Sequence, residues 1–247
     1  MEPSRLAVTR HRIGTPESPD QTPLRVAALM DLHLKSIGKL EESVAERLSA
    51  LSPDLILIVG DAVDRDDALP TLGDFLELLP PRVPMYAILG NWEHWSGVNL
   101  SELAATYYRF SGRLLVNDAV RISHGGRDAV LVGIDDLVGG APDLGRARQK
   151  VSGGDPALLL SHCPGYRDSL GPRDRRRFVA MLSGHTHGGQ VTIGGWAPLR
   201  PRGSGRYVAG WYLDEGPDLY VSRGIGTSIV PVRLGSVPEL AYFEWFL

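Results

Sequence analysis

Several features are scarce in this sequence, and each scarcity excludes a class of protein. There is one cysteine, Cys163, so no disulfide can form within the chain and the fold cannot depend on an oxidising compartment. No stretch of about twenty consecutive apolar residues occurs, which argues against a membrane-spanning helix. Residues 1–20 lack the apolar run of a signal peptide. These absences favour a cytoplasmic protein.

Positive charge is not in excess either. The net charge is −3 at pH 7, so nucleic acid would have to bind through a local basic patch, and a nucleic-acid partner is disfavoured. Hydrophobic residues make up 43% of the chain, enough for a core of ordinary size. There is no internal repeat or long linker. We expect residues 1–23 to form an arm or edge strand and residues 24–247 a single, monomeric domain.

The pattern of apolar residues changes along the chain. In the first half, short apolar runs alternate with helical patterns, which predicts strands at 24–30, 55–59 and 85–89 and helices at 40–51, 69–79 and 101–110, the last capped by Ser101. The second half is richer in strands, predicted at 129–134, 157–160, 179–182, 190–193, 206–213, 219–221 and 240–246. Two sheets packed face to face, with helices outside, would bury these elements and make an α/β fold.

Five of these apolar strands end in side chains that can bind a metal ion. Because the carboxyl ends of parallel strands form the ligand crevice of an open sheet, segments far apart in sequence can converge there. Carboxylate, imidazole and amide ligands together suit Mn, Fe, Zn or Co better than Mg or Ca. The side chains are, in chain order, Asp31 and His33, Asp61 and Asp64, Asn91, His162, and His185 and His187.

Each short motif alone has a plainer interpretation. An Asp-x-His pair is usually a surface feature, Gly-Asp-x-x-Asp is usually a turn, and a histidine pair can belong to a hydrogen-bonded core network. The five motifs in this order, each after an apolar strand, favour a metal centre over these alternatives.

The ordered motif set resembles the calcineurin-like metallophosphoesterases. The likeness extends over residues 24–247, and the segments Gly-His-Thr-His-Gly-Gly-Gln (184–190) and Tyr-Val-Ser-Arg-Gly-Ile-Gly-Thr (220–227) resemble the bacterial branch of YkuE/YaeI-type phosphodiesterases. The resemblance implies a four-layer α/β/β/α sandwich of two mixed sheets flanked by helices. It also implies two divalent transition-metal ions, with manganese among the candidates.

The resemblance assigns a role to each ligand residue. It implies a bridging role for Asp61, and an orienting role for Asp64 instead of direct metal binding. The reaction it implies is hydrolysis, in which a metal-bridging hydroxide attacks phosphorus in line with the leaving group. By the same resemblance, the first metal is bound by Asp31, His33, Asp61 and His187, and the second by Asp61, Asn91, His162 and His185.

The third motif departs from the family pattern. Where the family commonly has a histidine that contacts the phosphate, this chain has Trp92, while the metal ligand Asn91 is kept. His94, two residues further on, is the nearest substitute for the missing proton donor if the chain is extended there. Trp92 would then stack on a base or line an apolar wall of the substrate site. We therefore expect Asp61, Asn91 and His94 to be the catalytic residues.

Two groups of arginines are candidates for anion binding. Arg202 and Arg206 lie in a Gly/Pro-rich loop just after the histidine pair, which favours contact with a substrate phosphate. The basic run at 173–177 is interpreted either as a solvated face or as a contact with an anionic head group or membrane surface.

These observations predict a binuclear metal-dependent phosphoesterase that hydrolyses phosphodiester or pyrophosphate bonds in a small-molecule or lipid-linked substrate. One alternative is a lipid precursor pyrophosphatase of the UDP-diacylglucosamine type, which acts in lipid A synthesis and would associate with the inner face of the membrane. A second is a metal-binding scaffold without catalysis, for which Trp92 is the only support.

Overall fold

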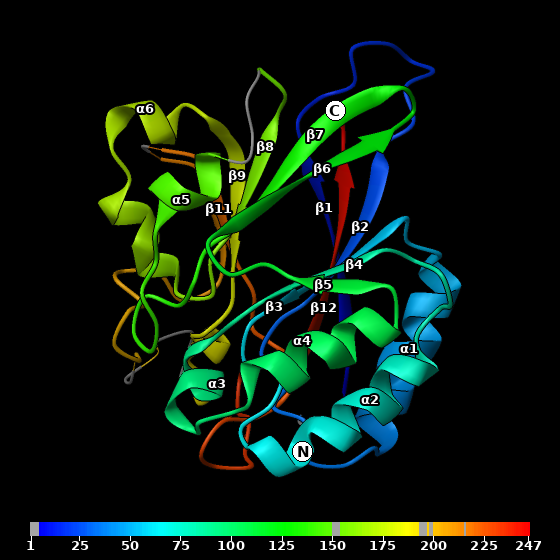
Figure 1. Cartoon of the computed structure of the whole chain (residues 1–247), viewed down its shortest axis with the longest axis vertical. Helices are drawn as coiled ribbons and strands as arrows, with labels where there is room; N and C mark the ends of the chain where they lie inside the picture. The colour runs from blue at the N-terminus through cyan, green and yellow to red at the C-terminus, as the bar shows by residue number, and fades with distance from the viewer. Residues whose placement is uncertain (1–4, 150–153, 193–196, 198–199, 215) are drawn as a thin grey trace.

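The computed structural model describes residues 5–149, 154–192, 197, 200–214 and 216–247 of the chain. It contains two six-stranded sheets that face each other (Figure 1). The first sheet has the spatial order β1 (Ala7–Ile13), β12 (Glu239–Trp245), β2 (Leu24–Leu29), β3 (Leu55–Val59), β4 (Met85–Ile88) and β5 (Gly112–Leu114). The second has the order β10 (Gly210–Tyr212), β11 (Asp218–Val221), β9 (Phe178–Ser183), β8 (Ala157–Leu160), β7 (Arg127–Gly133) and β6 (Asp118–His124).

Both sheets are mixed. In the first, β2 to β5 run parallel and β12 runs antiparallel to β2. In the second, β7, β8, β9 and β11 run parallel, and β6 and β10 are antiparallel strands at the two edges. The parallel strands are almost wholly buried, as in β3, whose five residues are all buried and all apolar. This pattern is expected where both faces of a parallel strand are covered.

Helices cover the outer faces of the two sheets. On the first sheet lie α1 (Lys39–Leu51), α2 (Leu69–Leu78) and α4 (Leu100–Arg109), whose apolar faces share one core with the sheet. On the second lie α5 (Leu144–Gln149) and the 3₁₀ turn Pro164–Ser169, followed by α6 (Pro172–Arg175). A third core, which includes Val26, Leu57 and Leu160, fills the space between the sheets. The prediction of two mixed sheets flanked by helices is confirmed.

Three short helical segments lie in the loops that follow strands. They are η2 (Asp66–Ala68) after β3, α3 (Asn91–Trp95) after β4, and η4 (His187–Gly189) after β9. No helix in the described part of the chain has both the length and the apolar character needed to cross a bilayer.

Some element boundaries differ from the sequence prediction. Helix α4 is capped by Asn99, whose side chain accepts hydrogen bonds from the backbone N–H groups of Ser101 and Glu102, so Ser101 lies inside the helix and is not its cap. The prediction of a strand at 190–193 is wrong for the described residues, because Val191 forms only an isolated bridge with Leu234; Ile193 lies outside the described residues.

The predicted strand at 206–213 is shorter than expected. Only Gly210–Tyr212 is β-structure, because the preceding segment turns at Gly203 and Gly205, which both have positive φ. The sequence prediction also missed β5 and β6. In β6 the partly buried apolar residues Val120 and Ile122 alternate with the exposed polar residues Arg121 and Ser123. This alternation weakens the apolar signal of the strand.

Candidate metal centre

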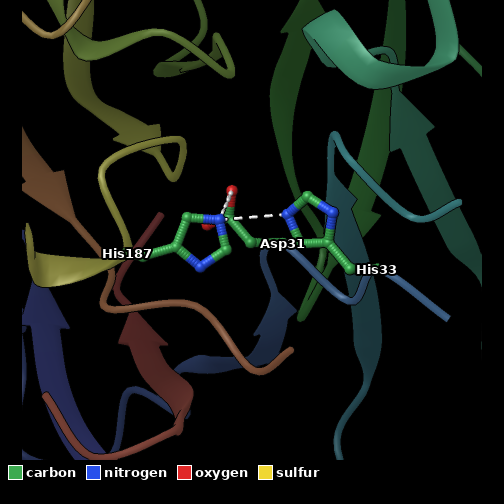
Figure 2. Close-up of side chains that lie close together, drawn as sticks. All are labelled: Asp31, His33 and His187. Atoms are coloured by element: carbon green, nitrogen blue, oxygen red, sulfur yellow. Dashed lines mark hydrogen bonds and ion pairs between the residues drawn. The ribbon is translucent and has the colours of Figure 1, made fainter. Parts of the chain in front are cut away.

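The polar side chains at the strand ends converge where the two sheets meet. Asp31 and His33 follow β2, and His187 follows β9 of the other sheet (Figure 2). Their ligand atoms lie within 4.8 Å of one another, and all three residues are buried. Nε2 of His187 lies 3.0 Å from Nε2 of His33 and 3.7 Å from Oδ1 of Asp31. Three ligands thus meet although 154 residues separate the two histidines.

A second group lies beside the first. Asp61, His162 and His185 follow β3, β8 and β9, and their ligand atoms also lie within 4.8 Å of one another. Nε2 of His162 is 3.1 Å from Oδ2 of Asp61. Asn91, at the start of α3, is buried, and the backbone N–H of its neighbour Trp92 donates to Oδ1 of Asp61 at 2.9 Å. The structure thus brings all seven predicted ligand residues to the same region.

Asp61 lies between the two groups. Its Oδ2 is 3.1 Å from Nε2 of His162 in the second group and 3.7 Å from Nε2 of His33 in the first. Oδ1 is held by the backbone of α3, which leaves Oδ2 to face both histidines. This is the position that a carboxylate needs in order to bridge two cations.

The outer ring nitrogens of three histidines are fixed by hydrogen bonds. Nδ1 of His162 donates to the carbonyl of Val59 at 2.9 Å, and Nε2 of His185 donates to the carbonyl of Arg202 at 2.8 Å. Nδ1 of His33 donates to the carboxylate of Asp64. In the neutral ring each bond leaves the other nitrogen with the lone pair, the arrangement typical of histidines that bind metal. Burial opposes protonation of His33 and His162, but the facing carboxylates raise the pKa of both, so a cation would replace a proton on these two rings.

His187 differs from these three. The guanidinium of buried Arg233 donates to its Nδ1 at 3.2 Å, so the proton of the neutral ring lies on Nε2, which faces His33. For a cation to bind at this nitrogen, the ring proton would have to move to Nδ1 and the bond from Arg233 would have to break. The pKa of His187 is held well below its ordinary value by burial and by the neighbouring His33 and Arg233, so the ring stays uncharged.

Several buried atoms of this region have no hydrogen-bond partner among the described residues. They include Oδ2 of Asp31 and Oδ1 of Asn91. Buried polar atoms in native proteins are rarely left unpaired unless an ion or water completes them. Carboxylate, amide and imidazole donors together fit a divalent transition metal. The residues present therefore fit two buried cation sites.

The charges of the site are consistent with cation binding. Burial opposes ionisation of Asp61, but the facing imidazole of His162 keeps the pKa of this carboxyl well below its usual range. Burial and the neighbouring His162 lower the pKa of His185 to about 4. Asp31 has a raised pKa, chiefly because it is fully buried, and a bound cation would reverse that effect. An ionised bridge and an uncharged imidazole are the forms that bind metal.

The backbone at the ligands is strained. Asp31, His33, Asp61, His185 and His187 all have positive φ, between 45° and 71°. Non-glycine residues seldom adopt this left-handed conformation, and where they do, the strain often marks a functional site. The close packing extends to Gly90, where a Cβ would overlap the side chain of Asp61.

Glu93 was given no role from the sequence, yet it organises the centre. It is buried, and its carboxylate accepts backbone N–H bonds from Asp61, Ala62 and Gly90 at 3.1, 2.6 and 2.9 Å, and a longer one from Val63. Burial and the nearby Asp61 raise the pKa of Glu93 to about 7. The signal was present: Glu93 is the third residue of α3 after its N-cap Gly90, the spacing of a capping box.

Trp92 and His94 do not lie in an extended chain as expected. The segment Asn91–Trp95 is helix α3, so the i, i+2 argument for Trp92 and His94 is wrong, and His94 instead shares a helix face with Asn91. Nε2 of His94 lies 2.6 Å from Oδ1 of Asp135, and this bond raises the pKa of His94. Asp135 follows the apolar strand β7, and the strand-end rule that found the other residues would have found it.

A hollow of about 520 Å³ adjoins the first group of ligands. Trp92 forms part of its wall, and its ring meets the ring of His33 edge-on at 6.2 Å between centroids. Asp64, the partner of His33, lines the same hollow. The remaining lining residues are Leu34, Lys35, Arg65, Asp67, Ala68 and Ile229. Trp92 therefore lines a partly apolar wall beside the metal ligands.

The arginine candidates lie in two different settings. Arg202 is exposed, and its carbonyl group contacts His185, so its side chain starts next to the second ligand group. Arg206 forms an ion pair with Asp214 and lies over the ring of Tyr207. In the basic run at 173–177, Arg175 and Arg177 donate to the backbone carbonyls of Leu170 and Asp155, at the far end of the second sheet.

The family profile of the calcineurin-like phosphoesterases matches residues 24–189. The chain is 30% identical over 251 residues to an uncharacterised metallophosphoesterase of Aquifex aeolicus, which covers 95% of this chain and 90% of that protein. It is also 30% identical over 253 residues to the phosphodiesterase YaeI of Escherichia coli, covering 98% and 89% of the two chains.

A solved structure shows the same fold. The dimetal phosphatase LOC 393393 of Danio rerio superposes with a TM-score of 0.51 at 12% identity, over 82% of this chain and 88% of that one. At this identity the likeness concerns the fold alone.

Proposed function

The chain belongs to the calcineurin-like phosphoesterase family and is a phosphoesterase hydrolase, and from that premise we propose that it cleaves phosphodiester or pyrophosphate bonds at a centre of two divalent metal ions. The observation that carries the proposal is the position of Asp61. Its Oδ2 faces a histidine of each ligand group, so one carboxylate can serve both ions.

The bound ions would supply Lewis-acid polarisation of the phosphoryl group and a water of lowered pKa. The residues of the chain have separate tasks. Asp31, His33 and His187 hold the first ion, and Asn91, His162 and His185 the second. Glu93 fixes the loop that carries Asp61 to the start of α3. Asp64 orients the ring of His33.

The proposed proton donor is His94. Its bond to Asp135 raises its pKa, which favours the protonated ring that would donate to a departing alkoxide. Its place on the same face of α3 as Asn91 puts it toward the metal side of the helix. For Arg202 we propose contact with a substrate phosphate; Arg206 is the weaker candidate, because Asp214 already neutralises it.

A lipid-linked substrate is the second candidate, and the hollow beside His33 favours it. Leu34, Ala68, Trp92 and Ile229 give this hollow an apolar wall, while the formal charges of its other lining residues, Lys35, Asp64, Arg65 and Asp67, cancel. A phosphodiester or pyrophosphate with an apolar substituent, as in a UDP-diacylglucosamine-type precursor, matches that lining. Such an enzyme would work at the inner face of a membrane.

The non-catalytic scaffold is less well supported. A site that had lost catalysis need not keep seven ligand residues, the bridging position of Asp61 and the hydrogen bonds that orient each histidine. Nucleic acid is disfavoured as a substrate by the net charge of −3.

The test is a substrate screen with metal-reconstituted protein. Protein loaded separately with Mn, Fe, Zn or Co is assayed against phosphomonoesters, phosphodiesters, nucleotide pyrophosphates and UDP-sugar lipids, with chelator-treated protein as the control. We expect metal-dependent release of product from diesters or pyrophosphates. Protein that holds two ions per chain and hydrolyses none of these compounds would support the scaffold instead.

A further inference from the structure

The loop at residues 228–234, here called the aliphatic loop, exposes its aliphatic side chains and buries its charged one. Ile229, Val230, Val232 and Leu234 are 83%, 52%, 48% and 54% exposed. The only charged residue of the loop, Arg233, is 3% exposed. Single exposed aliphatic residues are ordinary, but a contiguous group next to a buried arginine is not.

This arrangement is held by specific bonds. Beneath the loop, Arg233 donates to the backbone carbonyls of Gly226 and Arg223 at 2.9 and 2.7 Å. The side chain of Gln190 donates to the carbonyls of Ser228 and Val230 at 3.1 and 2.8 Å. Arg233 therefore works as a buried anchor, and its bonds keep the neighbouring aliphatic side chains directed outward.

Ile229 adds a second sign of constraint. Its φ is 56°, a left-handed conformation that is a genuine outlier for a β-branched residue. Strain of this kind persists only where the surrounding structure imposes it, and it is concentrated at functional segments. The strained residue is also the most exposed large apolar residue in the described part of the chain.

The loop adjoins the metal centre. Ile229 lines the same hollow as Trp92 and Asp64, and Asp64 is bonded to the ligand His33. Trp92 in turn meets the ring of Trp95, which is 57% exposed, edge-on at 5.9 Å between centroids. The loop thus reaches the hollow through Ile229. The orange-red part of the chain in Figure 1 includes this loop.

We propose that the aliphatic loop docks on the surface of a phospholipid bilayer and presents the hollow to lipid-borne substrate. Four aliphatic side chains are a small fraction of the roughly 1,200–2,000 Å² that a stable protein interface buries. They are sufficient for a lipid surface, where binding scales with the apolar area inserted. Tryptophan favours the membrane interface, and Trp92 lines the hollow with Trp95 against its ring.

Docking on a bilayer would bring the site to the lipid-linked substrate, so the inference rests on that form of the proposed function. Binding to vesicles is measured without catalysis. Metal-loaded protein is sedimented with vesicles of phosphatidylcholine, with and without phosphatidylglycerol. We expect the wild type to sediment with both, because insertion of aliphatic side chains does not require anionic lipid.

The variants separate the loop from general stickiness. Val230→Ser/Val232→Ser should lower the partition onto phosphatidylcholine vesicles at least about tenfold, since two aliphatic side chains no longer insert. The matched control is Leu213→Ser, which removes an apolar side chain of 68% exposure at the end of β10, outside the loop, and should bind like the wild type. Metal content, measured for each variant, shows that the fold is intact.

Three results would overturn the docking proposal: a wild type that binds neither vesicle, equal binding by the wild type and the double serine variant, or a double variant that changes the protein from dimer to monomer in gel filtration. The last would assign the loop to a second copy of the chain. Vesicle binding without hydrolysis of any phosphate ester would instead contradict the proposed function and leave the docking in place.

Discussion

At the scale of single residues, hydrogen bonds to the backbone hold one carboxylate oxygen of Asp61 and of Asp31 and determine which oxygen can face a cation. Asp61 has one oxygen held by the backbone of Trp92 and the other free to face two histidines. Asp31 similarly accepts the backbone N–H of His185 with Oδ1 and leaves Oδ2 without a partner among the described residues. These commitments fix ligand atoms in place before a cation arrives, which is what a preorganised site requires.

Asp61→Asn should affect both ligand groups, because the bridging oxygen loses its charge. We expect metal content to fall from two ions per chain toward zero and turnover to fall by several orders of magnitude. His33→Ala should remove chiefly one ion. Elemental analysis of the two variants beside the wild type measures the difference. Near-normal activity of Asp61→Asn with Mn would contradict the bridging assignment.

His94→Ala should show a loss that depends on the leaving group. If the protonated ring assists departure, hydrolysis of an alkyl diester should slow by about 10²–10⁴-fold, while a nitrophenyl diester, which needs no protonation, should change little. Asp135→Asn should lower the pKa of His94 and move the basic limb of the alkyl-diester pH profile to lower pH. Equal losses on both substrates would assign His94 to structure or phosphate binding.

Arg202 and Arg206 form a matched pair. If the side chain of Arg202 binds a substrate phosphate, Arg202→Ala should lower kcat/KM. The fall should correspond to a loss of about 1.5–3 kcal/mol of transition-state stabilisation, the range for a charged hydrogen bond. Arg206→Ala should have little effect, because that side chain is paired with Asp214 and Tyr207. Steady-state kinetics on the best substrate, with metal content checked, decides between them. Unchanged kinetics for Arg202→Ala would exclude its phosphate contact.

At the scale of elements, α3 shows what sequence patterns can and cannot predict. The strand ends were predictable, because an apolar run followed by Asp, Asn or His marks the carboxyl end of a buried parallel strand. The five-residue helix after β4 was not, since it is held by tertiary contacts of Glu93 more than by local propensity. The sequence pattern therefore did not predict that His94 lies on the same face of α3 as Asn91.

The carboxyl group of Glu93 makes stability depend on pH. Its pKa is raised from 4.5 to about 7 by burial and by Asp61, so the protonated form is favoured in the folded state. This contribution is fully present below about pH 4.5 and is lost as the pH rises through about 7.

Glu93→Gln resembles the protonated acid and should remove this dependence. In chelator-treated protein, the wild type should therefore lose free energy of unfolding relative to Glu93→Gln as the pH rises over this window. Urea denaturation of both proteins at several pH values measures the difference. A constant difference across the window would show that the four backbone donors keep Glu93 ionised throughout.

At the scale of the whole molecule, the sandwich brings distant segments to one edge. Two sheets with parallel central strands place the ends of β2, β3 and β4 opposite those of β8 and β9, so ligands from both halves of the chain face one another. The class of fold and the convergence of the candidate ligand residues could be predicted from sequence. Arg233 could not, because nothing in a run of aliphatic residues shows that its arginine turns inward against His187.

The central claim is that two cations bind at the two ligand groups and share Asp61. The most direct test is elemental analysis of the wild-type protein after reconstitution with excess transition metal and removal of unbound ions. The account predicts about two ions per chain, because two buried groups of three candidate ligand residues are present. A stoichiometry near zero or one would contradict it, whatever activity the protein shows.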